Sequence, residues 1–181
     1  MQSQDRNMVS RLSQMGLMLA LAVIMGYVEM LIPLSIGMPG IKAGFANIVI
    51  LFVLYTFGFK EALIISALRT VIIAFLFTSP AMLLYSFSAA VVSAAVMDKF
   101  RQKAVFSIYG ISALGGVVHN ITQFIVAVII SIFGNRNAFG FMFSFYLPLL
   151  LVAGEAAGLI NAVIVKPVMK ALGKDSLCTH I

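Results

Sequence analysis

The chain has 181 residues, of which 62% are hydrophobic and only 10% are charged, and its formal net charge is +6. Soluble domains carry about 25% charged residues, so this composition excludes an ordinary water-soluble domain and indicates an integral membrane protein. The basic total does not indicate nucleic-acid binding, because the cations are divided among short segments that would meet anionic lipid headgroups.

Apolar runs long enough to cross a bilayer follow one another along the chain. A helix rises about 1.5 Å per residue, so roughly 20 apolar residues cross about 30 Å of hydrocarbon. The runs do not alternate between polar and apolar residues, as the strands of a membrane β-barrel would, and helices satisfy their backbone hydrogen bonds internally. The sequence therefore predicts an all-α, polytopic protein with six transmembrane helices. The expected spans are residues 12–32, 43–58, 61–78, 81–97, 105–133 and 143–166.

These spans form one predicted domain, residues 12–170, between polar tails at residues 1–11 and 171–181. No Pro/Ser-rich linker or long-period repeat marks a second domain. Only the segment GFK separates the second span from the third, which predicts a tight helical hairpin.

The distribution of basic residues predicts the orientation. An even number of spans places both termini on one side, and most of the 12 Lys and Arg residues fall on that side. The positive-inside rule then places both termini in the cytoplasm. The basic residues on that side are Arg6, Arg11, Lys60, Lys99, Arg101, Lys103, Lys166, Lys170 and Lys174.

Polar residues within the apolar spans predict a binding site. Charged residues deep in a bilayer cost roughly 2.5–3.5 kcal/mol each on insertion scales, so they usually pair, line a cavity or bind a ligand. His119, Asn120 and Gln123 share one helix face by their spacing of three and four. The candidate substrate-binding residues, all in the middle or outer half of the spans, are Glu29, Lys42, Asn47, Arg69, His119, Asn120, Gln123 and Glu155.

Simpler roles for these residues stay open. His119, Asn120 and Gln123 can each hydrogen-bond between helices as packing contacts. Arg69 and Glu155 can form an internal ion pair, and Lys42 can extend to the outer headgroups.

Small residues at spacings of four provide a second pattern, in the first, fourth and sixth spans. Such spacing permits close helix contact and usually serves packing within a bundle. The pattern in the first span leads from the cytoplasmic tail and is a candidate interface for a separate protein. It consists of Gly16, Ala20, Ala22 and Gly26.

Several chemistries lack candidate residues. The aspartates Asp5, Asp98 and Asp175 are isolated, so no cluster is expected to hold Mg²⁺ and a diphosphate. No GxxxxGK[ST] loop is present to bind ATP, and the single cysteine, Cys178, excludes an intramolecular disulfide or a Cys-x-x-Cys metal site. We therefore expect no enzymatic activity, no metal and no cofactor.

Three segments carry a resemblance to a known family. They are IPLSIGMPGIKAGFANIVILF, GFKEALIISALRTVI and GGVVHNITQFIVA, followed by a last span that bears glycine and glutamate. In this order they resemble the membrane family called heptaprenyl diphosphate synthase component I, over roughly residues 12–170. That family is grouped with the Gx transporters and the substrate-binding (S) components of energy-coupling-factor (ECF) transporters.

The resemblance implies an S-component-like bundle of six helices in the bacterial cytoplasmic membrane, with cytoplasmic termini. It implies that a vitamin-like molecule binds in the outer half, under the loop at residues 33–41. It also implies contact between the first helix and a transmembrane coupling subunit driven by two ATPases, although that pattern is usually alanine-rich and here includes Gly16 and Gly26.

The sequence leaves three hypotheses for function. The first is a substrate-binding membrane subunit that imports a small organic solute. The second is a non-catalytic membrane partner of a prenyl diphosphate or quinone-pathway enzyme. The third is a solitary proton-coupled carrier that uses Glu155 and His119 as a relay.

Overall fold

The fold is an all-α bundle, as the sequence predicts. The computed structural model describes residues 2–31, 44–77, 80–104, 106–132 and 142–174, which contain no strand. The described elements are α1 (Gln2–Leu31), α2 (Phe45–Thr56), α3 (Phe59–Phe77), α4 (Pro80–Gln102), α5 (Ile108–Ile132), the π-helical turn η2 (Met142–Tyr146) and α7 (Leu147–Ala171).

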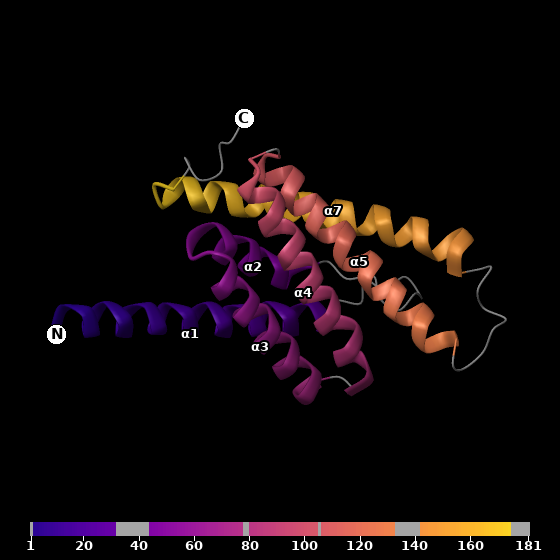
Figure 1. The fold of residues 1–181 in the computed structure, drawn as a ribbon, viewed down its shortest axis with the longest axis horizontal. Helices are drawn as coiled ribbons and strands as arrows, with labels where there is room; N and C mark the ends of the chain where they lie inside the picture. Colours follow the sequence, from indigo (N-terminus) through magenta and orange to yellow (C-terminus); the bar gives the residue numbers. More distant parts are fainter. Residues whose placement is uncertain (1, 32–43, 78–79, 105, 133–141, 175–181) are drawn as a thin grey trace.

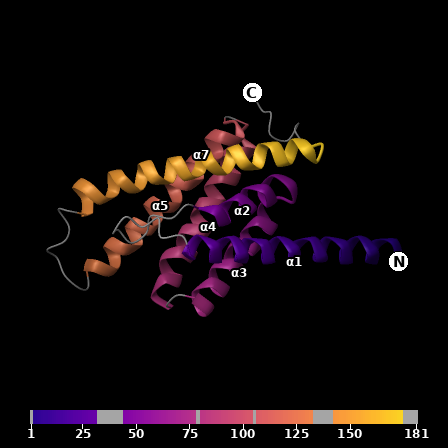
Figure 2. The ribbon, with the colours of Figure 1, turned by 180° about the vertical axis from the view of Figure 1, so that it is seen from behind.

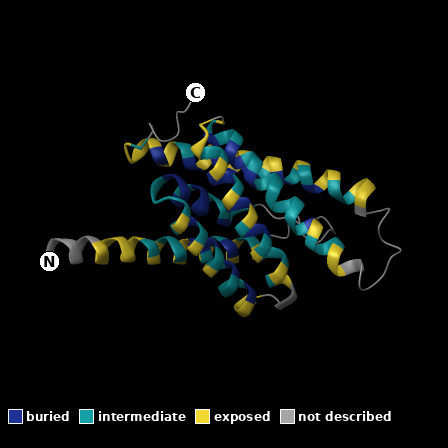
Figure 3. Cartoon of the chain, viewed as in Figure 1, coloured by how far each residue is buried: buried dark blue, intermediate teal, exposed yellow. Residues whose placement is uncertain are grey.

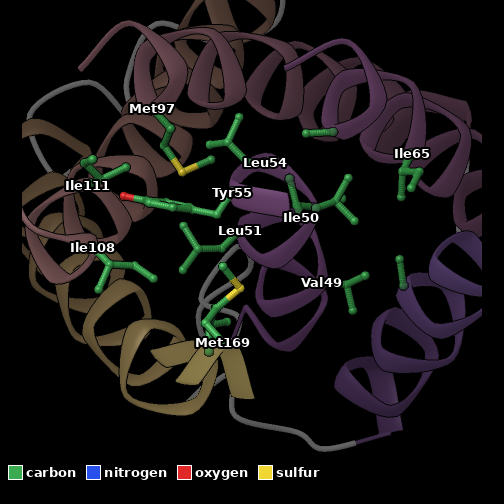
Figure 4. Packing of buried hydrophobic residues seen from close by; sticks show 14 residues of the cluster. Val49, Ile50, Leu51, Leu54, Tyr55, Ile65, Met97, Ile108, Ile111 and Met169 are labelled. Atoms are coloured by element: carbon green, nitrogen blue, oxygen red, sulfur yellow. The ribbon is translucent and has the colours of Figure 1, made fainter. Parts of the chain in front are cut away.

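The short helix α2 lies at the centre of the bundle. α1 packs on α2 and α3, and α3, α4, α5 and α7 then follow one another by pairwise contact, with α2 between α1 and α7 (Figures 1 and 2). Only 12 residues long, α2 is mostly apolar around its circumference, so it can be enclosed by its neighbours. Leu51, Leu54 and Tyr55 point from it toward Met97 of α4, Ile108 and Ile111 of α5, and Met169 of α7 (Figure 4).

The predicted hairpin between the second and third spans is confirmed. α2 ends at Thr56 and α3 begins at Phe59. Gly58 between them adopts φ 107°, a backbone conformation that side chains disfavour. Its N–H and that of Phe57 both donate to Val53 O, at 3.2 and 2.8 Å, so the turn closes the end of α2 before α3 starts.

Glycines bring α5 and α7 into backbone contact. A Cβ added at Gly154 would lie 2.7 Å from Gly116 O, and one at Gly158 would lie 2.6 Å from Ala113 Cα. Ser112 Oγ donates to Gly158 O at 2.6 Å across the same crossing. The Gly154 and Gly158 pattern of the last span therefore serves packing within the bundle.

Four described helices are long and apolar enough to cross a membrane. They are Met8–Leu31, Met82–Gln102, Ile108–Ile130 and Phe143–Ala171. Large apolar side chains such as Phe75, Leu76 and Val152 are exposed on the bundle, which suits lipid as the surrounding solvent. α2 is shorter than expected from residues 43–58, and α3 includes the charged residues Lys60, Glu61 and Arg69.

The first helix begins earlier than the sequence suggests. Residues 2–11, expected as a tail, belong to α1, whose first turns project beyond the rest of the bundle (Figure 1). Met8, Val9 and Leu12 are exposed there (Figure 3). Arg11 forms an ion pair with Glu61 at the start of α3, which ties this projecting segment to the hairpin.

Candidate functional site

A cavity of about 110 Å³ lies where all six described α-helices contribute residues. A buried water needs at least ~10–15 Å³ by this kind of measure, so the cavity has room for several waters or a small organic group. Its walls comprise Gly26, Glu29 and Met30 of α1; Gly44 and Asn47 at the start of α2; Arg69, Thr70, Ile73 and Ala74 of α3; Met82 and Ser86 of α4; Gly116, His119, Asn120 and Gln123 of α5; and Gly154 and Ala157 of α7.

Most of the polar residues singled out from the sequence meet at this cavity. Those that line it are Glu29, Asn47, Arg69, His119, Asn120 and Gln123. They come from four helices that are distant in sequence, so their convergence is a property of the fold.

Glu29 connects the end of α1 to the start of α2. The N–H of Gly44 donates to Glu29 Oε1 at 2.5 Å. Gly44 adopts φ 73° and precedes the first turn of α2, so the carboxylate lies at the N-terminus of that helix, where a negative charge is stabilised. Glu29 thereby fixes one wall of the cavity.

Removing the Glu29 carboxylate should destabilise the protein more than removing an acid of similar size elsewhere. We expect Glu29→Ala to lower the free energy of unfolding by about 1.5–3 kcal/mol, the range for a hydrogen bond to a charged group. Glu61→Ala is the matched control, because its ion pair with Arg11 is solvent-exposed and should contribute at most about 1 kcal/mol. Thermal unfolding followed by circular dichroism measures both, and equal losses would contradict this role of Glu29.

Among the described residues of the cavity wall, the cation is Arg69, near the middle of α3. Its Nε is buried, and no described residue accepts a hydrogen bond from it. The Glu29 carboxylate on the same wall accepts a hydrogen bond from the Gly44 N–H. The neighbouring Thr70 hydroxyl donates back to Ser66 O at 2.8 Å.

The α5 residues occupy one helix face, as their spacing predicts. Asn120 Nδ2 donates to Leu150 O of α7 at 2.7 Å, so this side chain also connects two helices. The packing role that the sequence left open is thus realised for Asn120. His119 and Gln123 line the cavity one turn apart.

Glu155 does not share the cavity, contrary to the sequence-based expectation. It is exposed on α7, whereas its neighbour Gly154 faces α5 and lines the cavity. Successive helix residues are rotated by about 100°, and the close glycine contact fixes which face of α7 turns inward. The proposed Arg69–Glu155 ion pair is therefore absent from the described contacts. Lys42 and the loop at residues 33–41 lie outside the described residues.

The four small residues of the first helix do not form one outward face. Gly16 and Ala20 are exposed, whereas Ala22 and Gly26 are buried. A Cβ at Gly26 would lie 3.3 Å from Ile73 Cδ1 and 3.9 Å from Ala46 Cβ. Ala22 and Gly26 thus pack α1 inside the bundle and are not accessible to a separate protein.

Thr70 and Ser86 also line the cavity, although the sequence did not single them out as site residues. Ser86 belongs to the small-residue pattern of the fourth span, with Ala90 and Ala94, which are buried. In the sequence, only the position of Ser86 four residues before Ala90 distinguishes it, and a serine at such a spacing normally indicates helix packing and not a binding site.

The described residues show no constellation suited to a metal. No group of three or more His, Cys, Asp and Glu side chains comes together among them. Asp98 accepts hydrogen bonds from Arg101 Nη2 at 2.7 Å and from Gln102 Nε2 at 2.5 Å. This carboxylate therefore stabilises the end of α4.

The comparison with protein families agrees with the motif order in the sequence. The model of the family "heptaprenyl diphosphate synthase component I" matches residues 18–168. The chain belongs to this family. The match includes every described residue that lines the cavity. Neither curated proteins nor solved structures give a match.

Proposed function

We propose that this component I family member is a substrate-binding integral membrane subunit, similar in role to the S component of an ECF transporter. It would import a small vitamin-like or precursor molecule, held in the outer half of the bundle, and would itself catalyse no reaction. The observation that supports this proposal is the convergence of polar side chains from separate apolar helices on one cavity.

The physical argument concerns the cost of polar groups in a membrane. Ligand pockets are mostly apolar hollows with a few placed polar groups that fix orientation. Here Ile73, Ala74 and Met82 supply apolar wall, whereas His119 and Gln123 supply hydrogen-bonding groups. If the polar residues served packing alone, they would be expected to contact one another across helices and to leave no hollow between them.

The proposed topology has six spans in the cytoplasmic membrane, with both termini inside the cell. The first turns of α1 and the last turns of α7 lie toward the same end of the bundle (Figures 1 and 2). Arg11 pairs with Glu61 at this end, and Lys166 Nζ lies 5.0 Å from the centre of the Tyr109 ring. Basic residues at this end are what the positive-inside rule predicts for a cytoplasmic face.

Import requires an energy source, and the sequence contains no GxxxxGK[ST] loop for ATP. In the proposal, a transmembrane coupling subunit with two ATPases supplies it. The exposed small residues Gly16 and Ala20, beside exposed Leu12 and Leu17 on α1, are the surface through which such a subunit would bind. Ala22 and Gly26 have no part in this surface.

The family name supports a second candidate function. A family called heptaprenyl diphosphate synthase component I suggests a non-catalytic membrane partner of a prenyl diphosphate or quinone-pathway enzyme. Co-purification with a soluble, aspartate-rich synthase, without ATPases, would favour this candidate over import. The relay of the proton-coupled carrier is not retained, because Glu155 is exposed on α7 while His119 lines the cavity.

Native mass spectrometry of the purified protein tests the proposed function. We expect a fraction of the protein to carry a small organic molecule that dissociates on activation in the gas phase. Protein that is folded by circular dichroism but carries no molecule, even after incubation with a small-molecule extract of its own cells, would contradict the proposal.

A further inference from the structure

The two charged groups in the described cavity wall, Glu29 and Arg69, differ in their hydrogen-bond partners. Glu29 accepts the Gly44 N–H at 2.5 Å and lies at the N-terminus of α2. Because a helix N-terminus carries a partial positive charge, the negative charge of Glu29 is stabilised by the backbone. The Glu29 carboxylate therefore has a described hydrogen-bond partner other than Arg69.

Arg69 has no comparable partner among the described residues. A guanidinium presents five N–H donors and stays charged in proteins, yet the buried Nε of Arg69 has no hydrogen-bond acceptor among the described residues. The protein therefore leaves a cation with an unmet buried donor in the wall of the cavity.

We infer that the ligand of this cavity is a small, water-soluble organic anion whose carboxylate or phosphate binds the Arg69 guanidinium. The inference rests on the proposed function, because it names the chemical class of the molecule that the cavity takes. Guanidinium pairs with carboxylate and phosphate through two parallel hydrogen bonds, and Nε contributes to one such edge. The apolar body of the anion would pack on Ile73, Ala74 and Met82, which line the same cavity.

The remaining polar residues suit the rest of such a ligand. Asn47, Ser86 and Gln123 are neutral and can donate or accept, so they discriminate among anions without adding charge. With one unpaired cation in the described wall, a single anionic group matches the site better than a diphosphate. The cavity volume of about 110 Å³ likewise favours a small molecule over a lipid headgroup with its chains.

Matched pairs of acids and amides test the charge requirement directly. The protein is reconstituted in nanodiscs of phosphatidylcholine alone, and its thermal unfolding is followed by circular dichroism. The probes are acetate against acetamide, benzoate against benzamide, and inorganic phosphate, at equal ionic strength. We expect at least one of these anions to raise the unfolding temperature while its amide partner does not.

Variants then locate the effect. Arg69→Gln should weaken binding of the effective anion roughly 10- to 100-fold, the loss expected for a charge-assisted hydrogen bond, and Arg69→Lys should restore part of it. Arg11→Gln is the matched control, since it removes a cation whose described ion pair lies outside the cavity; we expect it to bind as the wild type does. If Arg69→Gln does not fold, the comparison of acids with amides on the wild type still decides the charge requirement.

The inference would be overturned by amides that stabilise as well as acids, by the absence of any stabilising anion, or by an anion effect that persists in Arg69→Gln. Stabilisation by added phosphatidylglycerol but by no soluble anion would overturn it too, because the anionic group would then belong to a lipid. If native mass spectrometry finds a bound neutral molecule, the ligand is not an anion, but the proposed substrate-binding function still stands. If it finds no bound molecule, the proposed function itself is contradicted.

Discussion

Gly116→Ala is expected to lower the free energy of unfolding by about 2–3 kcal/mol, although a single methyl group is added. The new Cβ would strike the Gly154 carbonyl group, with Gly154 C at 2.9 Å. Backbone atoms cannot rotate away as a side-chain end can, so α5 and α7 would have to separate, and overpacking typically costs 1–3 kcal/mol. The separation would also stretch the Ser112–Gly158 and Asn120–Leu150 hydrogen bonds.

Gly16→Ala is the matched control for this prediction. A Cβ at Gly16 would meet nothing within 4 Å, and alanine favours a helix over glycine by about 0.8–1.0 kcal/mol. We therefore expect Gly16→Ala to leave stability unchanged or slightly higher. The chain has no tryptophan, so thermal unfolding is best followed by circular dichroism. Similar unfolding temperatures for the two variants would mean that α5 and α7 do not meet at Gly116.

The double variant His119→Ala/Gln123→Ala is expected to bind the carried molecule at least roughly 100-fold more weakly than the wild type. Each lost hydrogen bond contributes about 0.5–1.5 kcal/mol, and a ligand group left unsatisfied in the cavity adds about 1–3 kcal/mol. Asn120 is left in place because its amide also holds α5 on α7. Competition binding with the molecule identified by mass spectrometry measures the change.

Glu155→Gln provides the comparison for that loss. Glu155, like His119 and Gln123, is a polar residue within an apolar helix. Glu155 is exposed on α7, however, whereas His119 and Gln123 line the cavity. The glutamine variant should bind as tightly as the wild type. A similar loss in both variants, or in neither, would show that the cavity wall does not determine binding.

The sequence predicted the helices better than the directions of their side chains. Apolar runs and the GFK hairpin indicated α2 through α7 because hydrophobicity and length are local properties. The α5 face with His119 and Gln123 followed from helical spacing alone. Glu155 was misplaced because its direction depends on which face of α7 meets α5, and backbone contact at Gly116 and Gly154 decides that.

The small residues of the first span illustrate the same limit. Gly16 and Ala22 belong to similar sequence patterns, yet one is exposed and the other is fully buried. The spacing of small residues shows that another helix can pack closely on α1. It does not show whether that helix is α2 or α3 of the same chain or belongs to a separate protein. The sequence also predicted a longer second helix than α2. An apolar run shows where a helix can form, but it does not show at which residue the helix begins, and here the N-cap is Gly44.

Cysteine labelling tests most directly whether water reaches a polar cavity between these helices. Cys178 is the single native cysteine, so Cys178→Ser gives a protein without cysteine. Two variants are then made in it: Gln123→Cys on the cavity face of α5, and Ile125→Cys on the exposed apolar face of the same helix. With a membrane-impermeant thiol reagent applied from outside the cell, we expect Gln123→Cys to react and Ile125→Cys to stay unmodified in lipid. Equal labelling of the two cysteines, or none at Gln123→Cys from outside, would contradict a water-filled cavity open to the exterior.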